Sequence, residues 1–183
     1  IDLWNVAAAT LGLLRYPAPP WSLPPRAGAL TVLALLPVLC VWGWIEGGWV
    51  RLRTVVVESD RLPVGAPPLR LVQIADMHIG RTVRPAVWRR VLELVREAQP
   101  DVLVSTGDLV DASDRFVASW VQELRTVQPP MGKFAVLGNH EFYPGVARTM
   151  LFLEEGGFSI LRGQGVDLAP GVRLVGVDDP AGQ

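Results

Sequence analysis

The sequence predicts an α/β fold with a layered sheet, preceded by a transmembrane helix or helices, and three observations support this. From residue 69 onward, short apolar runs rich in β-branched residues alternate with amphipathic helical patterns, which is the order typical of α/β domains. Before that region, 27–45 forms a run of nineteen residues without a charged side chain. Polar residues of the kind that bind metal ions directly follow three of the apolar runs.

Composition excludes several other classes of protein. The 183 residues allow one ordinary domain with an appendage. Lysine and arginine total 17 and acidic residues total 18, so the net charge is −1. A nucleic-acid partner bound by bulk charge is therefore not expected. The single cysteine, Cys40, excludes a disulfide framework and a thiolate zinc cluster.

Residues 1–50 are predicted to form a membrane region. At about 1.5 Å per residue, a helix over about 27–45 is roughly 28 Å long, close to the hydrocarbon thickness of a bilayer. Trp42, Trp44 and Trp49 gather at its far end, as expected at a membrane interface. The alternative, a buried core helix, is disfavoured by the length of the run and by its lack of charges.

The rest of the membrane region is less regular. Residues of about 3–14 are apolar but short, and we interpret them as part of an earlier span. The segment 15–26 holds five prolines and is predicted to be a loop between the two spans. Two arginines stand on each side of the predicted helix. Positive-inside counting is therefore a tie. We expect the protein at the cell membrane, with the side on which the rest of the chain lies undetermined.

The remainder divides into a linker with an entry strand at 51–68 and a domain at 69–183. Within the domain, periodicity predicts helices at about 85–98, 114–127 and 144–155. Pro85 suits the first position of the first helix, and Gly156-Gly157 marks the end of the third. Apolar runs predict strands at 69–75, 102–106, 134–137 and 172–177.

The most informative feature is the set of polar residues that follow three predicted strands. These segments are Asp76-Met77-His78, then Gly107-Asp108 with Asp111, then Asn139-His140-Glu141. Each segment alone is common in turns, but the carboxyl ends of strands in an α/β sheet meet at one edge. Carboxylate, imidazole and amide ligands at one edge are what a two-metal site for phosphoryl chemistry requires. Asp108, on the middle strand, is expected to bridge two cations, for which Mn, Fe and Zn are all suitable.

These three motifs in this order resemble the calcineurin-like metallophosphoesterases, and in particular their bacterial membrane-anchored phosphodiesterase branch. The resemblance covers about Leu69 to the end of the chain. It implies a layered β-sandwich flanked by helices, in which Asp76, His78 and Asp108 bind the first of two divalent metal ions. Asp108 also bridges to the second metal ion, which Asn139 ligates. His140 is then not a ligand but a catalytic residue that stabilises charge on the phosphoryl group or protonates the leaving oxygen.

Two acidic residues fit a supporting role. Asp111 and Glu141 suit a second shell that orients the ligands, and they equally suit turn and helix-cap acids. Asp178 and Asp179 follow the last apolar run. We predict a type I turn before Pro180 there, with a supporting role at the site as the alternative.

The sequence also departs from the family pattern. The family has three further metal-binding histidines, one alone and two in a Gly-His-x-His motif, whereas no histidine follows His140 here. We therefore expect the chain to be a fragment, incomplete at its C-terminus and inactive by itself, with 69–183 forming the N-terminal part of the domain.

Two functions follow as hypotheses. The first is a membrane-anchored metallophosphoesterase that cleaves phosphoester bonds, specifically phosphodiesters, with a two-metal site. Its expected partners are membrane lipids and a phosphoester substrate, with anchoring pointing to a lipid-linked one. The alternative is a degenerate, non-catalytic binding module anchored to the membrane, which the missing histidines favour. A purely structural α/β domain would make the three motifs a coincidence.

Overall fold

The structure is a computed structural model that describes residues 24–80, 83–111, 115–143 and 145–180. It separates into two compact units, Ile1–Trp49 and Val50–Gln183, and each is described by itself. The predicted partial span at about 3–14 lies outside the described residues.

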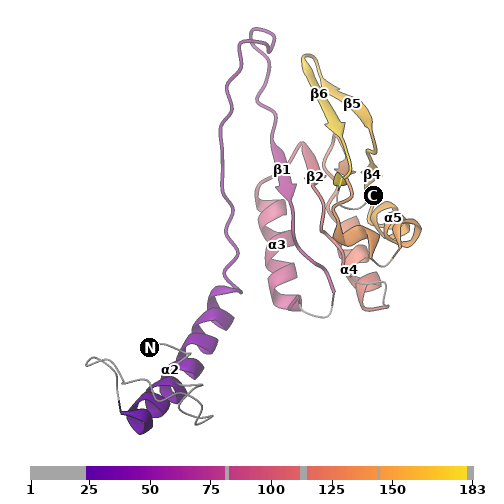
Figure 1. Ribbon diagram of the computed structural model, residues 1–183. Coiled ribbons are helices and arrows are strands. Elements are labelled where there is room, and N and C mark those ends of the chain that lie inside the picture. The colour runs from indigo at the N-terminus through magenta and orange to yellow at the C-terminus, as the bar shows by residue number, and fades with distance from the viewer. Residues whose placement is uncertain (1–23, 81–82, 112–114, 144, 181–183) are drawn as a thin grey trace. The chain divides into compact units, whose positions relative to one another are not determined.

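The first unit contains helix α2, Pro25–Glu46 (Figure 1). The helix covers the predicted segment of about 27–45 but begins earlier, inside the predicted loop at 15–26. The prediction of a loop up to residue 26 was wrong because proline is tolerated in the first turn of a helix, where its missing N–H has no partner to lose. Along α2, leucine and tryptophan side chains remain largely exposed.

The second unit is built on a parallel sheet of four strands in the order β1-β2-β3-β4 (Figure 1). The strands are β1 Leu71–Ile74, β2 Val102–Ser105, β3 Lys133–Ala135 and β4 Ser159–Ile160. In the register, Leu71 pairs with Val102, and Leu103 pairs with Lys133. Because all four strands run the same way, their carboxyl ends reach one edge of the sheet, and the predicted site residues lie beyond these ends.

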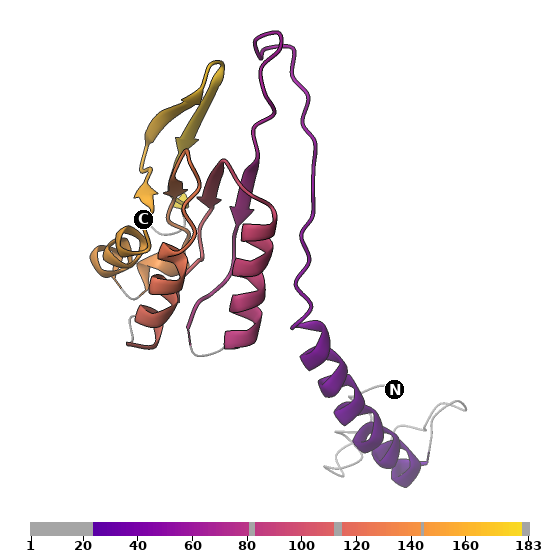
Figure 2. The same cartoon turned by 180° about the vertical axis from the view of Figure 1, so that it is seen from behind.

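Helices connect the strands in turn, as seen from both sides in Figures 1 and 2. They are α3 Pro85–Glu97, α4 Arg115–Arg125 and α5 Val146–Glu155, with a short 3₁₀ helix, η1 His140–Phe142, before α5. Trp88 of α3 stacks on Trp120 of α4 with ring centroids 5.9 Å apart. In β1, Val72 and Ile74 are buried whereas Leu71 is exposed, so the core lies on one face of this strand. The α/β fold class and its flanking helices are as predicted.

A second, two-stranded sheet follows β4. It consists of β5 Gln164–Ala169 and β6 Val172–Gly176, paired antiparallel. The sequence predicted β6, but neither β4 nor β5. Strand β4 has only two residues, too few to appear as an apolar run in the sequence. Strand β5 carries Gly165 and Asp167, which are unfavourable in strands. A Cβ on Gly176 would lie 2.5 Å from the Leu161 backbone oxygen, so the hairpin packs tightly against the chain after β4.

Other boundaries differ from the predictions by a few residues. Helix α3 ends at Glu97 and α4 ends at Arg125, close to the predicted 98 and 127. The segment 51–68, predicted to include an entry strand, contains turns and irregular chain but no strand. A strand needs a hydrogen-bonded neighbour, and the valines in this segment, Val55 to Val57, stay exposed instead.

The only lysine of the sequence, Lys133, is buried at the start of β3. Its Nζ donates to the Leu124 carbonyl at 2.9 Å and to the Gly156 carbonyl, and lies 5.4 Å from the centroid of the Phe158 ring. These contacts join β3 to the ends of α4 and α5. Burial, with a smaller contribution from the charge of Arg125, lowers the pKa of Lys133 to about 8.

This lowered pKa predicts a pH-dependent stability. Between about pH 8 and the ordinary lysine pKa, the unfolded chain holds a proton that the folded chain has lost. Raising the pH through this window therefore favours the folded state. We expect the free energy of unfolding, measured by urea titration, to rise over this window in the unaltered chain. Lys133→Met should remove that rise, and an equal rise in both proteins would contradict the prediction.

Candidate metal centre

The backbone after β1 and β2 stays paired beyond the strands. Asp76 N–H donates to the Gly107 carbonyl at 3.2 Å, and His78 N–H donates to the Asp108 carbonyl at 2.9 Å. Asp76, His78 and Asp108 all have positive φ, at 53°, 46° and 52°. This left-handed conformation is uncommon for residues other than glycine, and such outliers cluster at functional sites. The first two predicted motifs are therefore joined through their main chains.

Glycines allow the segments after β2 and β3 to approach closely. A Cβ on Gly107 would lie 2.8 Å from the Gly138 Cα, and a Cβ on Gly138 would lie 2.2 Å from Asp108 Oδ1. Real Cβ atoms do not approach other atoms this closely. Only glycine therefore fits at these two positions, where the Asp108 carboxylate lies against the backbone of the third motif.

Glu141 lies beneath this contact and has no solvent exposure. Its carboxylate accepts hydrogen bonds from the backbone N–H groups of the second and third motifs. The donors are Asp108 at 2.8 Å, Leu109 at 2.7 Å, Val110 at 3.2 Å and Gly138 at 2.8 Å. Glu141 therefore contacts the chain that carries Asp108, rather than any ligand side chain.

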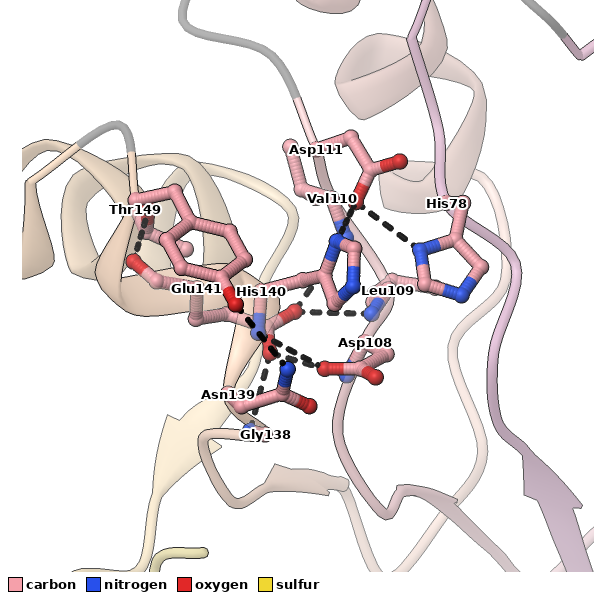
Figure 3. Close-up of polar contacts among 11 residues, drawn as sticks. His78, Asp108, Leu109, Val110, Asp111, Gly138, Asn139, His140, Glu141 and Thr149 are labelled. Carbon is pink, nitrogen blue, oxygen red and sulfur yellow. Dashed lines mark hydrogen bonds and ion pairs between the residues drawn. The ribbon is translucent and has the colours of Figure 1, made fainter. Parts of the chain in front are cut away.

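The two histidines of the chain share one carboxylate oxygen (Figure 3). Asp111 Oδ1 lies 2.8 Å from Nδ1 of His78 and 2.8 Å from Nδ1 of His140. The rings are edge to face, with centroids 4.5 Å apart. Because Asp111 occupies both Nδ1 atoms, Nε2 is the nitrogen that each ring can offer to a metal ion.

Three of the side chains are close enough to hold one ion together. His78, Asp108 and His140 each offer a ligand atom, and these atoms lie within 4.8 Å of one another. Asp76 and Asp108 both line a cavity of about 400 Å³ at this edge of the sheet. Imidazole nitrogen with carboxylate oxygen suits Zn, Mn or Fe, so the donor set fits a divalent metal ion.

Asn139 lies beside Asp108 in Figure 3. Its amide Nδ2 is 3.4 Å from the Tyr143 hydroxyl, which leaves the amide oxygen as the group that can ligate. The Asp108 carboxylate accepts the His140 backbone N–H at 3.0 Å through Oδ1. Because the three motifs follow β1, β2 and β3, which are neighbours in the sheet, the predicted site residues come from three adjacent strand ends.

The electrostatic environment of His78 favours its protonated form. The hydrogen bond with Asp111 raises the pKa of His78 above its ordinary value of 6.5, with further contributions from the charges of Asp111, Asp108 and Asp76 that outweigh the effect of burial. The surroundings of this imidazole are therefore strongly negative, as suits a cation site.

Asp178 is a further acidic residue that lines the cavity. Its side chain is 6% exposed, and it accepts a 2.6 Å hydrogen bond from Arg162 Nε in an ion pair. Asp179 N–H donates to the Leu137 carbonyl at 2.9 Å. The two aspartates thus run beside the end of β3, and the turn predicted at Pro180 continues into residues outside those that the structure describes. No sequence signal links them to Arg162, which lies on another segment.

Comparison with known proteins agrees with this arrangement. A family model described as calcineurin-like phosphoesterase matches residues 69–176, which is more than half of the chain. The chain belongs to this family. The family resemblance predicted from the three motifs is therefore confirmed, as is the fold class that goes with it.

Relatives of this calcineurin-like phosphoesterase include bacterial and animal proteins. An uncharacterized metallophosphoesterase of Aquifex aeolicus is 35% identical over 146 residues, 80% of this chain and 56% of that protein. A transmembrane protein with metallophosphoesterase domain of Danio rerio is 32% identical, over 75% of this chain and 30% of that protein. UDP-2,3-diacylglucosamine pyrophosphatase LpxG of Chlamydia trachomatis is 30% identical, over 67% of this chain and 38% of that protein. The chain thus matches about half or less of each of these relatives.

The contact between Gly138 and Asp108 yields a testable prediction. In Gly138→Ala, the new methyl group would collide with the Asp108 carboxylate and its backbone nitrogen, so the backbone must shift. Such overpacking costs about 1–3 kcal/mol, and we expect a loss of stability of that size in a urea titration. Gly43→Ala is the control, since a Cβ there meets no atom within 4 Å. Equal stability of Gly138→Ala and the unaltered chain would refute the close contact.

Proposed function

We propose that this protein is a metal-dependent phosphoesterase that cleaves phosphodiester bonds with two divalent metal ions. The observation that carries the proposal is that one side-chain atom each of His78, Asp108 and His140 lies within 4.8 Å of the others at the carboxyl edge of a parallel sheet. Of these three residues, we assign His78 and Asp108 to the metal ions and His140 to the substrate. Membership of the calcineurin-like phosphoesterase family supports metal-dependent chemistry on phosphoric esters. The two-metal arrangement and the choice of diester are our proposal.

In this proposal, Asp76, His78 and Asp108 hold one ion, and Asp108 and Asn139 hold the other. Bound divalent ions would supply Lewis-acid neutralisation of the phosphoryl oxygens and a nucleophile at neutral pH. Asp108 would serve both ions, and its backbone has the left-handed conformation, with φ of 52°. Asp111 fixes the His78 ring by binding Nδ1, which directs Nε2 to the ligand position.

His140 acts on the substrate in this proposal. Its Nδ1 is hydrogen-bonded to Asp111 at 2.8 Å, which orients the ring. With Nδ1 held by Asp111, Nε2 is the ring atom from which a proton can pass to the leaving oxygen or a hydrogen bond can reach the phosphoryl group. The side chain is 35% exposed, so a substrate can reach it.

The proposed substrate is a lipid-linked phosphodiester or a related pyrophosphate at the cell membrane. Among the described residues, one helix, Arg26–Glu46, is long and apolar enough to cross a membrane. The Danio rerio relative is named as a transmembrane protein, and LpxG is named for a diacylglucosamine nucleotide. Each phosphorus of such a substituted pyrophosphate carries two substituents, as in a phosphodiester. Membrane lipids and a lipid-linked phosphoester are therefore the proposed partners.

Replacing Asp108 tests the reaction. Asp108→Asn removes the negative charge of the proposed bridging ligand. We expect hydrolysis of bis(p-nitrophenyl) phosphate by the full-length enzyme to fall by at least the roughly 10- to 100-fold that loss of a mere supporting residue causes. Removing metal with a chelator should abolish the same activity, and adding Mn²⁺ or Zn²⁺ should restore it. Asp167→Asn, on the exposed hairpin, is the control and should keep full activity. Undiminished turnover by Asp108→Asn would refute the proposal.

The alternative function is a degenerate, non-catalytic binding module anchored to the membrane, and it is motivated by the absence of a histidine after His140 in this sequence. It requires at most one weakly bound ion in each molecule. Metal analysis of the purified full-length protein separates the two functions, because two tightly bound ions per molecule would exclude the binding module.

Substrate class can be tested separately. If the membrane helix serves to reach a lipid-linked substrate, hydrolysis of a nucleoside diphosphate bearing a diacylated sugar in mixed micelles should exceed that of a soluble nucleotide sugar with the same headgroup. Released nucleoside monophosphate measures both reactions. Activity confined to the soluble compound would contradict the lipid-linked substrate while leaving phosphoester hydrolysis in place.

A further inference from the structure

We propose that Glu141 is a positioning residue, whose buried carboxylate holds the backbone around Asp108 in the conformation that binds metal. This inference rests on the proposed function, since it concerns the same metal centre. Glu141 itself contacts no ligand side chain: the atoms that its carboxylate binds are main-chain nitrogens.

The four hydrogen bonds divide evenly between the two carboxylate oxygens. Oε1 accepts from Leu109 N–H and Val110 N–H, and Oε2 accepts from Asp108 N–H and Gly138 N–H. Oε1 therefore binds only the segment after β2, whereas Oε2 links that segment to the segment after β3. The carboxylate fixes the separation of the two strand ends that supply Asp108 and Asn139.

The negative charge of Glu141 is balanced by these amides. Among the residues that the structure describes, no ion pair joins Glu141 to a basic side chain. Successive backbone N–H groups that point into one concavity form an anion-binding nest, and here the anion is a side chain of the same protein. The nest keeps the N–H groups of residues 108–110 directed at Glu141, while Asp108 also lines the cavity.

The conformation held in this way is one that Asp108 does not favour. Its φ of 52° is in the left-handed region, which the surrounding structure must impose. Thr149 Oγ1, in α5, donates to the Glu141 carbonyl at 3.1 Å. Helix α5 thus anchors Glu141, which in turn imposes the left-handed conformation on Asp108. The chain of contacts runs from α5 through Glu141 to the Asp108 backbone.

The arrangement requires a carboxylate rather than an amide. Glutamine has the same shape, but one of its terminal atoms is an NH₂ group that donates hydrogen bonds. In either orientation, this NH₂ group would face two backbone N–H donors. Glu141→Gln thus alters the hydrogen bonding of two amides while hardly changing the volume of the side chain.

The test is Mn²⁺ affinity, measured by electron paramagnetic resonance in detergent micelles, for the unaltered protein and Glu141→Gln. Replacing a residue that supports metal ligands from outside the coordination sphere alters metal affinity by about 10- to 100-fold, and we expect Glu141→Gln to bind Mn²⁺ more weakly by that factor. Glu155→Gln, an exposed glutamate of α5, removes the same charge and should leave the affinity unchanged. Leu92→Ala, in the buried core of α3, should lower thermal stability without lowering Mn²⁺ affinity.

A second measurement does not depend on the folding of a variant. In the unaltered, metal-free protein, the amides of residues 108–110 and 138 should exchange slowly with solvent because Glu141 holds them. Fast exchange at these positions would overturn the inference. Equal Mn²⁺ affinity of Glu141→Gln and the unaltered protein would overturn it while leaving the proposed function intact. Failure of the unaltered protein to bind either Mn²⁺ or Zn²⁺ would overturn both.

Discussion

The structure of the site depends on the contact between the main chains that follow β2 and β3. Gly107 and Gly138 meet there at a distance that excludes any Cβ atom. The Asp108 carboxylate lies against Gly138 and accepts the N–H of His140. Ligand positions on two strands are thus set by backbone contact, which is more precise than contact between long side chains.

Two acidic residues stabilise this arrangement from different sides. Asp111 binds the ring nitrogens of His78 and His140, and Glu141 binds the amides behind Asp108. One orients side chains and the other orients main chain. Both use the strong, charge-assisted hydrogen bonds of a carboxylate, and together they hold the two imidazole rings and the Asp108 backbone in place. Such preorganisation limits the reorganisation that metal binding has to bring about.

The sequence predicted the parts of the fold that have strong periodicity. Helix α3 was placed within a residue because Pro85 marks its start and its apolar face is regular. Strands β4 and β5 were missed because they are short or rich in glycine and depend on tertiary contacts. Convergence of the three motifs was predictable, since parallel strands share an edge. Three other features could not be predicted, because each depends on distances between separate segments of the chain. They are the left-handed conformation of Asp108, the sharing of Asp111 by two rings and the pairing of Asp178 with Arg162.

The buried position of Lys133 has a practical consequence. Because it is the only lysine, the chain carries a single side-chain amine, and that amine is enclosed between β3, α4 and α5. An amine-specific acylating reagent can modify this side chain only when these elements separate. The protein therefore contains its own chemical reporter of local opening, at the end of the sheet opposite the metal centre, and no label has to be introduced.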